Sequence, residues 1–299
     1  MEKLLFTGAS GFLGKNVKPL LEEKYVVETI GLADSDTCKC NLAVAVPELS
    51  GHYDIVLHAA GKAHVVPRTE EEKKAFFDVN YQGTVHLCQA LERAGVPKAL
   101  VFVSTVAVYG RDSGEGITEE HPLNGDTPYA LSKIQAERFL QTWCGKHGVK
   151  LAIIRPSLLA GPNPPGNLGA MINGIRTGRY LSIAGGKARK SVLMVQDIAR
   201  LLPLLVEKGG TYNVCDTGQP SFGELERLIA RQLGRRQPMN IPYWLAKSLA
   251  LIGNCMGKHV PINSMRLRKI TGSLTFSNEK AVRELGWQPL DVLEHFKIS

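Results

Sequence analysis

The sequence has no apolar run long enough to cross a membrane, and it has no low-complexity tract or internal repeat. It begins without the charged segment and long apolar stretch that mark a signal peptide. Cysteine is sparse, since the 299 residues include six, scattered along the chain. These absences argue against membrane insertion and a disulfide framework, and they predict a cytoplasmic protein with reduced thiols.

Metal-binding patterns are also missing. Cys38 and Cys40 stand too close together to form half of a structural zinc site, and no second cysteine pair matches them. The histidines His52, His58 and His64 straddle a predicted strand and loop. We interpret them as structural residues and expect no metal site.

Acidic residues are fewer than basic ones, which leaves a formal net charge of +8. The basic residues gather in the second half, within 176–190, 231–236 and 266–269. No nucleic-acid-binding motif accompanies them, so we do not expect a nucleic-acid partner. Attraction of an anionic nucleotide diphosphate explains a positive C-terminal region more simply, and part of the charge can be solvated surface.

Three glycines follow the first apolar run at a spacing of three. That run, 3–7, predicts a strand, and a helical pattern begins near Lys15. Gly8 would permit a tight turn, Gly11 would let the backbone approach a pyrophosphate, and Gly14 would let the helix pack closely on the strand. A glycine turn that opens a helix points backbone N–H groups at a phosphate, which predicts a dinucleotide site here.

Tyr129 and Lys133 lie four residues apart in a predicted helix over 128–147, whose first turn Asp126 or Thr127 can cap. The spacing places both side chains on one helical face. A tyrosine must lose about three pKa units to act as a base near neutral pH, and a nearby ammonium favours the phenolate. We therefore predict that Tyr129 exchanges a proton during catalysis and that Lys133 lowers its pKa.

Apolar runs alternate with helical patterns in the first half of the chain. The predicted strands are 3–7, 25–30, 54–59, 99–104 and 151–155, and the predicted helices lie near 12–23, 71–94 and 128–147. This alternation predicts an α/β fold, a doubly wound parallel sheet with right-handed crossovers. The later predicted helices lie near 167–178, 196–207, 221–233 and 242–256. We expect this half to form a smaller lobe, with 192–198 and 212–214 returning to the main sheet.

Further motifs occur in a characteristic order. They are Thr7–Gly14, His58–Gly61, Asn80–Thr84, Val103–Gly110, Tyr129 with Lys133, Arg155–Pro156, Gly161–Pro162, Asn167–Leu168, Val195–Ala199 and Glu284–Trp287. Over nearly its whole length the chain thereby resembles the extended short-chain dehydrogenase/reductase family, which modifies nucleotide-linked sugars. The resemblance implies a Rossmann-type dinucleotide-binding domain over 1–160 and a C-terminal α/β lobe over 161–299 that binds a nucleotide sugar.

The resemblance also implies a catalytic hydroxyl four residues before a Tyr-Gly pair, which selects Thr105. Thr105, Tyr129 and Lys133 would form the catalytic set, with the threonine orienting the substrate oxygen. The sugar 4,6-dehydratases of this family carry Asp-Glu directly after that hydroxyl residue. Val106 and Ala107 stand there in this chain, and they can supply neither acid nor base. Dehydration is therefore not expected.

The implied cofactor is NAD, with NADP not excluded. At the end of the second strand neither Gly31 nor Leu32 supplies a charge, whereas Asp34 could reach the adenosine ribose or could be a loop acid. The other residues expected to bind the cofactor are Gly8, Ser10, Gly11, Phe12, Leu13, Gly14, Asn41, Leu42, His58, Ala59, Ala60, Asn80, Ser104, Tyr129, Lys133 and Pro156.

The implied substrate is a nucleotide-linked sugar, a UDP-hexose or UDP-N-acetylhexosamine. The residues expected to bind it are Lys62, Thr105, Asn167, Leu168, Arg189, Lys190 and Arg268. Lys190 stands where family members usually have an arginine, so the charge is kept and bidentate phosphate binding is lost. Either Arg266 or Arg268 is expected to add a second phosphate contact.

Together these features predict an NAD(P)-dependent oxidoreductase or epimerase that acts at C4 of the sugar. The alternative is a reductase of a 4-keto sugar nucleotide, which consumes reduced cofactor and belongs near the 4-ketoreductases of surface-polysaccharide synthesis. A dinucleotide-sensing regulatory protein is the non-enzyme alternative, and retention of Tyr129 and Lys133 argues against it. The resemblance further implies a homodimer.

Overall fold

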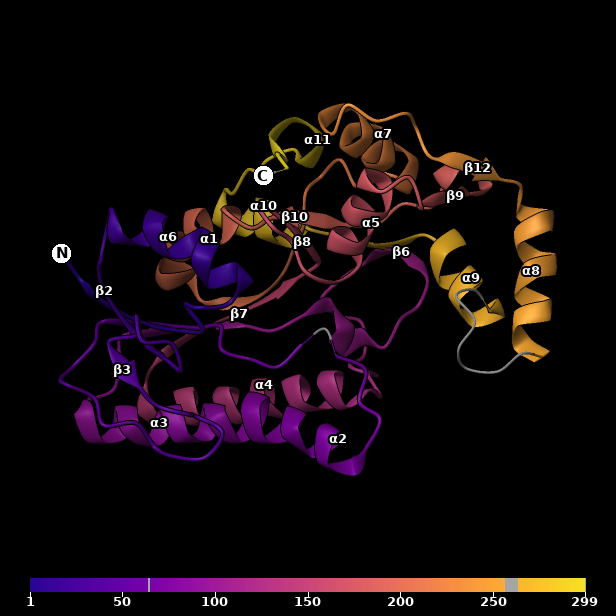
Figure 1. Ribbon diagram of the computed structural model, residues 1–299. Coiled ribbons are helices and arrows are strands. Elements are labelled where there is room, and N and C mark those ends of the chain that lie inside the picture. Colours follow the sequence, from indigo (N-terminus) through magenta and orange to yellow (C-terminus); the bar gives the residue numbers. More distant parts are fainter. Residues whose placement is uncertain (64, 256–262, 299) are drawn as a thin grey trace.

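A seven-stranded parallel sheet forms the centre of the protein in the computed structural model, which describes residues 1–63, 65–255 and 263–298 (Figure 1). The strand order is β11-β7-β5-β4-β1-β2-β3. The strands are β1 (Lys3–Thr7), β2 (Val26–Gly31), β3 (Cys38–Lys39), β4 (Ile55–His58), β5 (Ala99–Val103), β7 (Lys150–Pro156) and β11 (Gly210–Val214). This doubly wound order confirms the predicted α/β fold, and every strand predicted in the first half is present.

Helices cover both faces of the sheet. One layer contains α1 (Phe12–Glu22), α6 (Asp197–Lys208) and α10 (Glu279–Leu285), and the other contains α2 (Glu70–Phe77), α3 (Gly83–Ala94) and α4 (Pro128–His147). Strand side chains are sorted between these layers with a period of two. In β1, Leu4 and Phe6 pack with α1 and α6, while Leu5 packs with α3 and α4.

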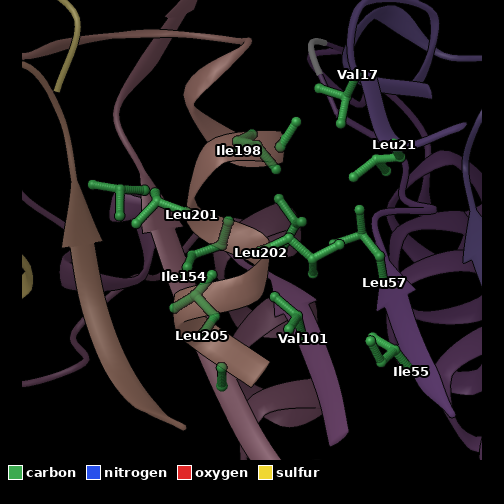
Figure 2. Packing of buried hydrophobic residues seen from close by; sticks show 14 of the residues in the cluster. Val17, Leu21, Ile55, Leu57, Val101, Ile154, Ile198, Leu201, Leu202 and Leu205 are labelled. Atoms are coloured by element: carbon green, nitrogen blue, oxygen red, sulfur yellow. The ribbon is translucent and has the colours of Figure 1, made fainter. Parts of the chain in front are cut away.

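The layer of α1 and α6 is closed by interlocking aliphatic side chains (Figure 2). Val17 and Leu21 of α1 and Leu202 of α6 belong to one buried cluster with Leu57 of β4 and Val101 of β5. All five are at most 1% exposed. This packing holds α1, and with it the glycine turn, rigidly at the carboxyl ends of β1 and β4.

The predicted helix 71–94 is interrupted. The π-helical segment η1 (Asp78–Gln82) separates α2 from α3. It contains Asn80, which is buried and hydrogen-bonds to both the loop after β4 and α4. Local π geometry of this kind is frequent at functional sites, and the apolar period of the sequence does not reveal it.

Three parallel two-stranded sheets lie outside the main one. They pair β8 (Leu158–Ala160) with β10 (Val192–Met194), β9 (Leu181–Ile183) with β12 (Met239–Ile241), and β6 (Gly114–Ile117) with β13 (Leu274–Phe276). The prediction that 212–214 joins the main sheet is confirmed by β11. The same prediction for 192–198 is wrong, because β11 occupies the edge beside β7 and β10 pairs with β8 instead.

The remaining elements surround these small sheets. They are η2 (Val106–Tyr109), α5 (Gly166–Arg176), η3 (Ala184–Gly186), α7 (Phe222–Gln232), α8 (Tyr243–Cys255), α9 (Ser264–Thr271) and α11 (Val292–His295). Leu168 of α5, Ile229 of α7 and Phe296 after α11 share a separate buried cluster. Among the helices of the described ranges, none combines the length and apolar character needed to span a bilayer.

Candidate active site

The glycine turn joins β1 to α1. Gly8 has φ +82°, and a Cβ there would approach the Ala60 backbone nitrogen to 2.7 Å. A Cβ on Gly14 would clash with the Ala9 backbone. Gly11 differs, because a Cβ there would meet only the Gly8 carbonyl oxygen, at 3.4 Å. Gly8 and Gly14 are thus required by the fold, whereas Gly11 leaves open space at the N-terminus of α1.

Two cavities meet at this turn. The larger, about 550 Å³, extends from Gly11 and Ala59 towards Tyr129 and Lys133. The smaller, about 280 Å³, extends from Gly11 past the end of β2 to Asn41. A dinucleotide needs such an elongated site, with its diphosphate at a helix N-terminus and its two nucleoside halves on either side. The residues at the turn therefore fit NAD(P).

The predicted cofactor residues divide between these cavities. Gly8, Gly11, Phe12, Leu13, Ala59, Ser104, Tyr129, Lys133 and Pro156 line the larger one. Gly8, Ser10, Gly11, Asn41, Leu42, Ala59 and Ala60 line the smaller one. Gly14, Asp34, His58 and Asn80 are not among the residues lining either cavity.

Tyr129 and Lys133 project from α4, which starts where the sequence predicts. Of the two capping candidates, Thr127 is the one used, since its side chain accepts a hydrogen bond from the Ala130 N–H. Lys133 is only 3% exposed, and its ammonium donates to the Val103 carbonyl oxygen at 2.8 Å. Burial lowers the pKa of Lys133 to about 8, and the Glu137 carboxylate opposes this shift.

The Thr105 hydroxyl interacts with the Tyr129 hydroxyl and favours its ionised form. The Thr105 oxygen also accepts from the Ala107 N–H at 3.1 Å and so caps η2. Burial raises the pKa of Tyr129, and the interaction with Thr105 opposes the rise. This direction differs from the predicted lowering by Lys133. The physical reason is that desolvation of the phenolate dominates, while the ammonium is engaged by the Val103 carbonyl.

A buried polar network supports the floor of the larger cavity. The Ser104 hydroxyl donates to Glu137, and Arg155 donates to both carboxylate oxygens of Glu137, at 3.1 and 2.6 Å. Arg155 also contacts the Tyr109 hydroxyl at 3.0 Å, and that hydroxyl donates to Asn213. Ser104 therefore lines the cavity with its hydroxyl already engaged.

Two acids follow β2, the predicted Asp34 and, two residues later, Asp36. Asp34 is exposed and pairs with Lys39 at 2.5 Å, and neither Asp34 nor Asp36 is among the residues that line the two cavities. The carboxylate of Asp36 instead lies against Gly31, which lines the smaller cavity, and accepts a hydrogen bond from the Ala33 N–H. The glycine at the strand end leaves room for this carboxylate. The chain turns back after Asp34, and sequence spacing alone gave no signal for that turn.

His58 and Asn80 act behind the cavity walls. The His58 ring is fully buried between the hydroxyls of Thr7 and Thr84, at 2.6 and 2.9 Å, and burial lowers its pKa to about 3. Asn80 accepts from the Lys62 N–H at 2.7 Å and donates to the Ser132 hydroxyl at 2.9 Å. Both residues fix the loop after β4 rather than present a side chain to the cavity.

The residues predicted for substrate binding are only partly gathered. Thr105 lines the larger cavity, and Lys62 is placed next to it by its bond to Asn80. Asn167 is exposed on α5, and Leu168 is buried in the core of that lobe. Of the seven residues predicted to bind the substrate, Thr105 is the one that lines the larger cavity.

The basic residues of this set lie elsewhere on the lobe. The Lys190 ammonium donates to the Gly272 carbonyl at 2.9 Å, and burial lowers its pKa. Arg268, one helical turn before Gly272, is exposed. Arg189 donates to the Gln219 carbonyl. The structure therefore ties Lys190 to Gly272, directly after the helix α9 that carries Arg268. The side chain of Arg266 lies outside the described residues.

Ser157 was missed by sequence reasoning. It lines the larger cavity and is 8% exposed, and its hydroxyl is a buried polar atom without a hydrogen-bond partner among the described residues. A buried hydroxyl with unused bonding capacity is suited to a polar ligand group. Its place directly after Pro156 at the end of β7 is the signal that could have found it.

A doubly wound sheet with a glycine-rich first turn and a Tyr–Lys helix beside it defines the extended short-chain dehydrogenase/reductase class. The chain matches the model of the NAD dependent epimerase/dehydratase family over residues 4–215 and belongs to that family. The predicted resemblance is thereby confirmed, as is the class of NAD(P)-dependent enzyme.

Individual members of the family share between 20% and 30% of their residues with this chain. The chain is 28% identical to N-acetyl-α-D-glucosaminyl-diphospho-ditrans,octacis-undecaprenol 4-epimerase of Escherichia coli O157:H7, over 93% of this chain and 88% of that protein. It is 30% identical to GDP-6-deoxy-D-mannose reductase of Pseudomonas aeruginosa, over 77% and 79%. The structure of UDP-glucose 4-epimerase of Thermotoga maritima with UDP-glucose superposes with a TM-score of 0.73 at 20% identity, over 98% of this chain and 95% of that chain. That likeness shows a shared fold.

Proposed function

We propose that this protein epimerises C4 of a nucleotide-linked sugar, a UDP-hexose or UDP-N-acetylhexosamine, with NAD or NADP as the cofactor. The observation that carries the proposal is the meeting of the Tyr129 and Thr105 hydroxyls beside buried Lys133, in a cavity that continues to the glycine turn. Similarity to a 4-epimerase of a diphosphate-linked sugar and to a UDP-glucose 4-epimerase supports this reaction class.

In this proposal Tyr129 removes the proton from the C4 hydroxyl and returns it after the sugar has changed face. Thr105 orients the same oxygen through the hydroxyl that interacts with Tyr129. Lys133 would hold the ribose hydroxyls of the cofactor through its ammonium. Bound nicotinamide supplies the acceptor and donor of hydride. The backbone N–H groups of the first turn of α1 would hold the diphosphate.

The cellular location, the oligomeric state and the roles of the two parts of the chain belong to the same proposal. The chain would act in the cytoplasm as a homodimer, with 1–160 binding the dinucleotide and 161–299 binding the sugar nucleotide. In support, the five cysteines whose side chains are described are free thiols. Leu131 of α4 is 40% exposed and, with Tyr81, lines a surface groove between α2 and α4. Phe77 and Pro128 also line this groove, and together these side chains offer apolar area to a second copy.

One relative favours a second candidate. The similar Pseudomonas aeruginosa protein is a GDP-6-deoxy-D-mannose reductase, so reduction of a 4-keto sugar nucleotide is the alternative. Both reactions use the same side chains, and they differ in cofactor stoichiometry. An epimerase converts many equivalents of UDP-sugar with cofactor in trace amounts. A reductase oxidises one reduced cofactor for each keto sugar consumed.

The experiment is a paired assay of the purified protein. UDP-glucose and UDP-N-acetylglucosamine with trace NAD are analysed for the C4 epimer, and the corresponding 4-keto compounds with NADH or NADPH are analysed for cofactor oxidation. Epimer formation supports the proposal, and stoichiometric oxidation without epimer formation replaces it by the alternative. If neither occurs and no nucleotide diphosphate raises the melting temperature, the sugar-nucleotide assignment is wrong.

Tyr129→Phe tests the role of the hydroxyl. It deletes the titrating group and keeps the ring, so turnover should fall by about 10²–10⁴-fold while cofactor affinity stays nearly unchanged. Thr105→Val, which is close to isosteric, should lower the rate and preserve the fold. Wild-type activity should decline as the pH falls, since the phenolate becomes protonated. Substantial turnover by Tyr129→Phe would contradict the mechanism even if cofactor binds.

A further inference from the structure

Exposed apolar side chains are concentrated on one small part of the molecule. Of the eighteen large apolar residues that are exposed in the described ranges, nine lie between residues 239 and 270. They are Met239, Tyr243, Trp244, Leu245, Leu249, Leu251, Ile252, Met265 and Ile270. We call this set the α8 surface. It belongs to β12, α8 and α9, which lie at the margin of the molecule away from the main sheet (Figure 1).

The helix α8 buries small residues and exposes large ones. Ala246 and Ala250 are fully buried in a cluster with Leu267 of α9. Trp244 is 68% exposed and Ile252 is 57% exposed. An ordinary surface helix of a globular protein has the opposite arrangement, with its large apolar side chains towards the core. The exposed face of α8 is therefore not explained by the packing of this chain.

The segment that carries this face has charges of one sign. Residues 227–278 include nine Lys and Arg and no Asp or Glu. Arg235, Arg236, Lys247 and Arg268 are exposed. Lys269 is the exception among the described bases near α9, because it pairs with Asp112 of another segment at 2.9 Å. Large apolar side chains are thus interspersed with unneutralised positive charge.

We propose that the α8 surface docks on an anionic lipid bilayer, with α8 lying along the headgroup level. A surface that carries Trp and Leu beside basic side chains is suited to this depth, since the apolar groups enter the acyl boundary and the cations meet lipid phosphates. Trp244, near the start of α8, has the amphipathic ring typical of membrane interfaces. No helix needs to cross the bilayer for this mode of binding.

A second copy of the chain fits this surface less well. A symmetric dimer places a patch against itself, so the bases of one copy would face the bases of the other. The segment 227–278 offers no acidic side chain to neutralise them. A phosphatidylglycerol surface supplies the missing negative charge, and it also receives the apolar side chains. Charge complementarity therefore selects the lipid.

The test is binding of the purified full-length protein to sedimentable vesicles, measured without nicotinamide cofactor or sugar. Vesicles of phosphatidylcholine with phosphatidylglycerol should bind the protein at least about tenfold more strongly than phosphatidylcholine alone, and added salt should weaken the binding. Trp244 fluorescence should shift to shorter wavelength on binding. This shift would report on Trp244, because the other two tryptophans, Trp143 and Trp287, are only 6% and 2% exposed.

Matched variants locate the surface. Trp244→Glu with Ile252→Glu should reduce vesicle affinity by about tenfold or more, whereas Val282→Glu on α10 should not. Lys247→Ala with Arg236→Ala should weaken binding to anionic vesicles, and Arg283→Ala, also on α10, serves as the charge control. All of these side chains are exposed, so circular dichroism and NAD affinity should match the wild type.

The result that would overturn the proposal is absence of binding to anionic vesicles, or binding that the Trp244 and Ile252 substitutions leave unchanged. A change of oligomeric state caused by Trp244→Glu in the absence of vesicles would assign the face to self-association instead. Because the readout uses neither substrate nor turnover, failure here is separate from failure of the proposed epimerase activity.

Discussion

At the scale of single residues, Lys133 shows that the candidate site costs stability. Its ammonium lies in the interior, and burial lowers its pKa from 10.5 to about 8. Between these two values the unfolded chain keeps a proton that the folded chain has released. The stability of the folded state therefore rises as the pH rises through this window. Below about pH 8 Lys133 is charged in the folded protein, and the desolvation of its ammonium lowers the free energy of unfolding by the full amount.

Lys133→Met should accordingly raise the melting temperature near neutral pH while removing activity. The difference from wild type should shrink as the pH is raised from about 8 to about 10, because the wild-type lysine becomes neutral there. Melting curves at several pH values check this. Lys146→Met, at an exposed position on the same helix, should show no such pH-dependent gap. A variant less stable than wild type at neutral pH would contradict the prediction.

We expect Asp36 to determine whether the protein prefers NAD or NADP. Its carboxylate lies against Gly31 at the wall of the smaller cavity, whereas Asp34 faces solvent. Asp36→Ala should weaken NAD binding by roughly tenfold, the loss expected for a hydrogen bond to a charged group. Affinity for NADP should rise, because a carboxylate there repels the 2′-phosphate.

Titration of both cofactors against Asp36→Ala and Asp34→Ala distinguishes the two acids. The Asp34 variant should bind like the wild type. If Asp36 only holds the loop through its bond to the Ala33 N–H, the variant would lose affinity for NAD and NADP alike.

At the scale of elements, the turn between β1 and α1 separates structural from functional glycines. Gly11→Val should fold, since its Cβ meets only the Gly8 carbonyl oxygen, at 3.4 Å, and loss of a good helix cap costs about 1 kcal/mol. Its side chain would enter the space for the diphosphate, so dinucleotide binding should be lost. Gly14→Val should instead prevent folding, because α1 could no longer lie against the Ala9 backbone.

Thermal unfolding together with a dinucleotide-induced thermal shift distinguishes these outcomes. Wild-type binding by a folded Gly11→Val would show that no phosphate lies at this turn. A folded, stable Gly14→Val would contradict the packing argument for the third glycine.

At the scale of the whole molecule, a buried ion pair and its hydrogen bonds link the first 160 residues to β11. Arg155 of β7 and Glu137 of α4 have side chains only 5% and 1% exposed, and Tyr109 extends their network to Asn213 of β11. Removing one partner of a buried pair leaves the other charge uncompensated.

Glu137→Gln should therefore lower the free energy of unfolding by about 3–5 kcal/mol. Glu22→Gln, which removes the partner of Lys18 in an exposed pair on α1, should change it by less than about 1 kcal/mol. Denaturant titration of both variants measures the difference. Equal effects would mean that the network does not hold the fold together.

The sequence by itself determined those features of the fold and the site that depend on residues close together in the chain. The apolar run of β1, the glycine spacing after it, and the separation of Tyr129 and Lys133 along α4 each depend on neighbouring residues. Their period and conformational limits are set locally. For this reason the strands of the first half, the glycine turn and the helix that carries Tyr129 and Lys133 were all predictable.

Only the tertiary structure decided where distant segments meet. It paired β10 with β8, put Asp36 rather than Asp34 at the end of β2, and surrounded Tyr129 with enough protein to raise its pKa. It also left the large side chains of α8 uncovered. Which strand pairs at the edge of a sheet, how far a group is desolvated and which side chains stay exposed all depend on neighbours in space. A pattern along the chain does not show which residues those neighbours are.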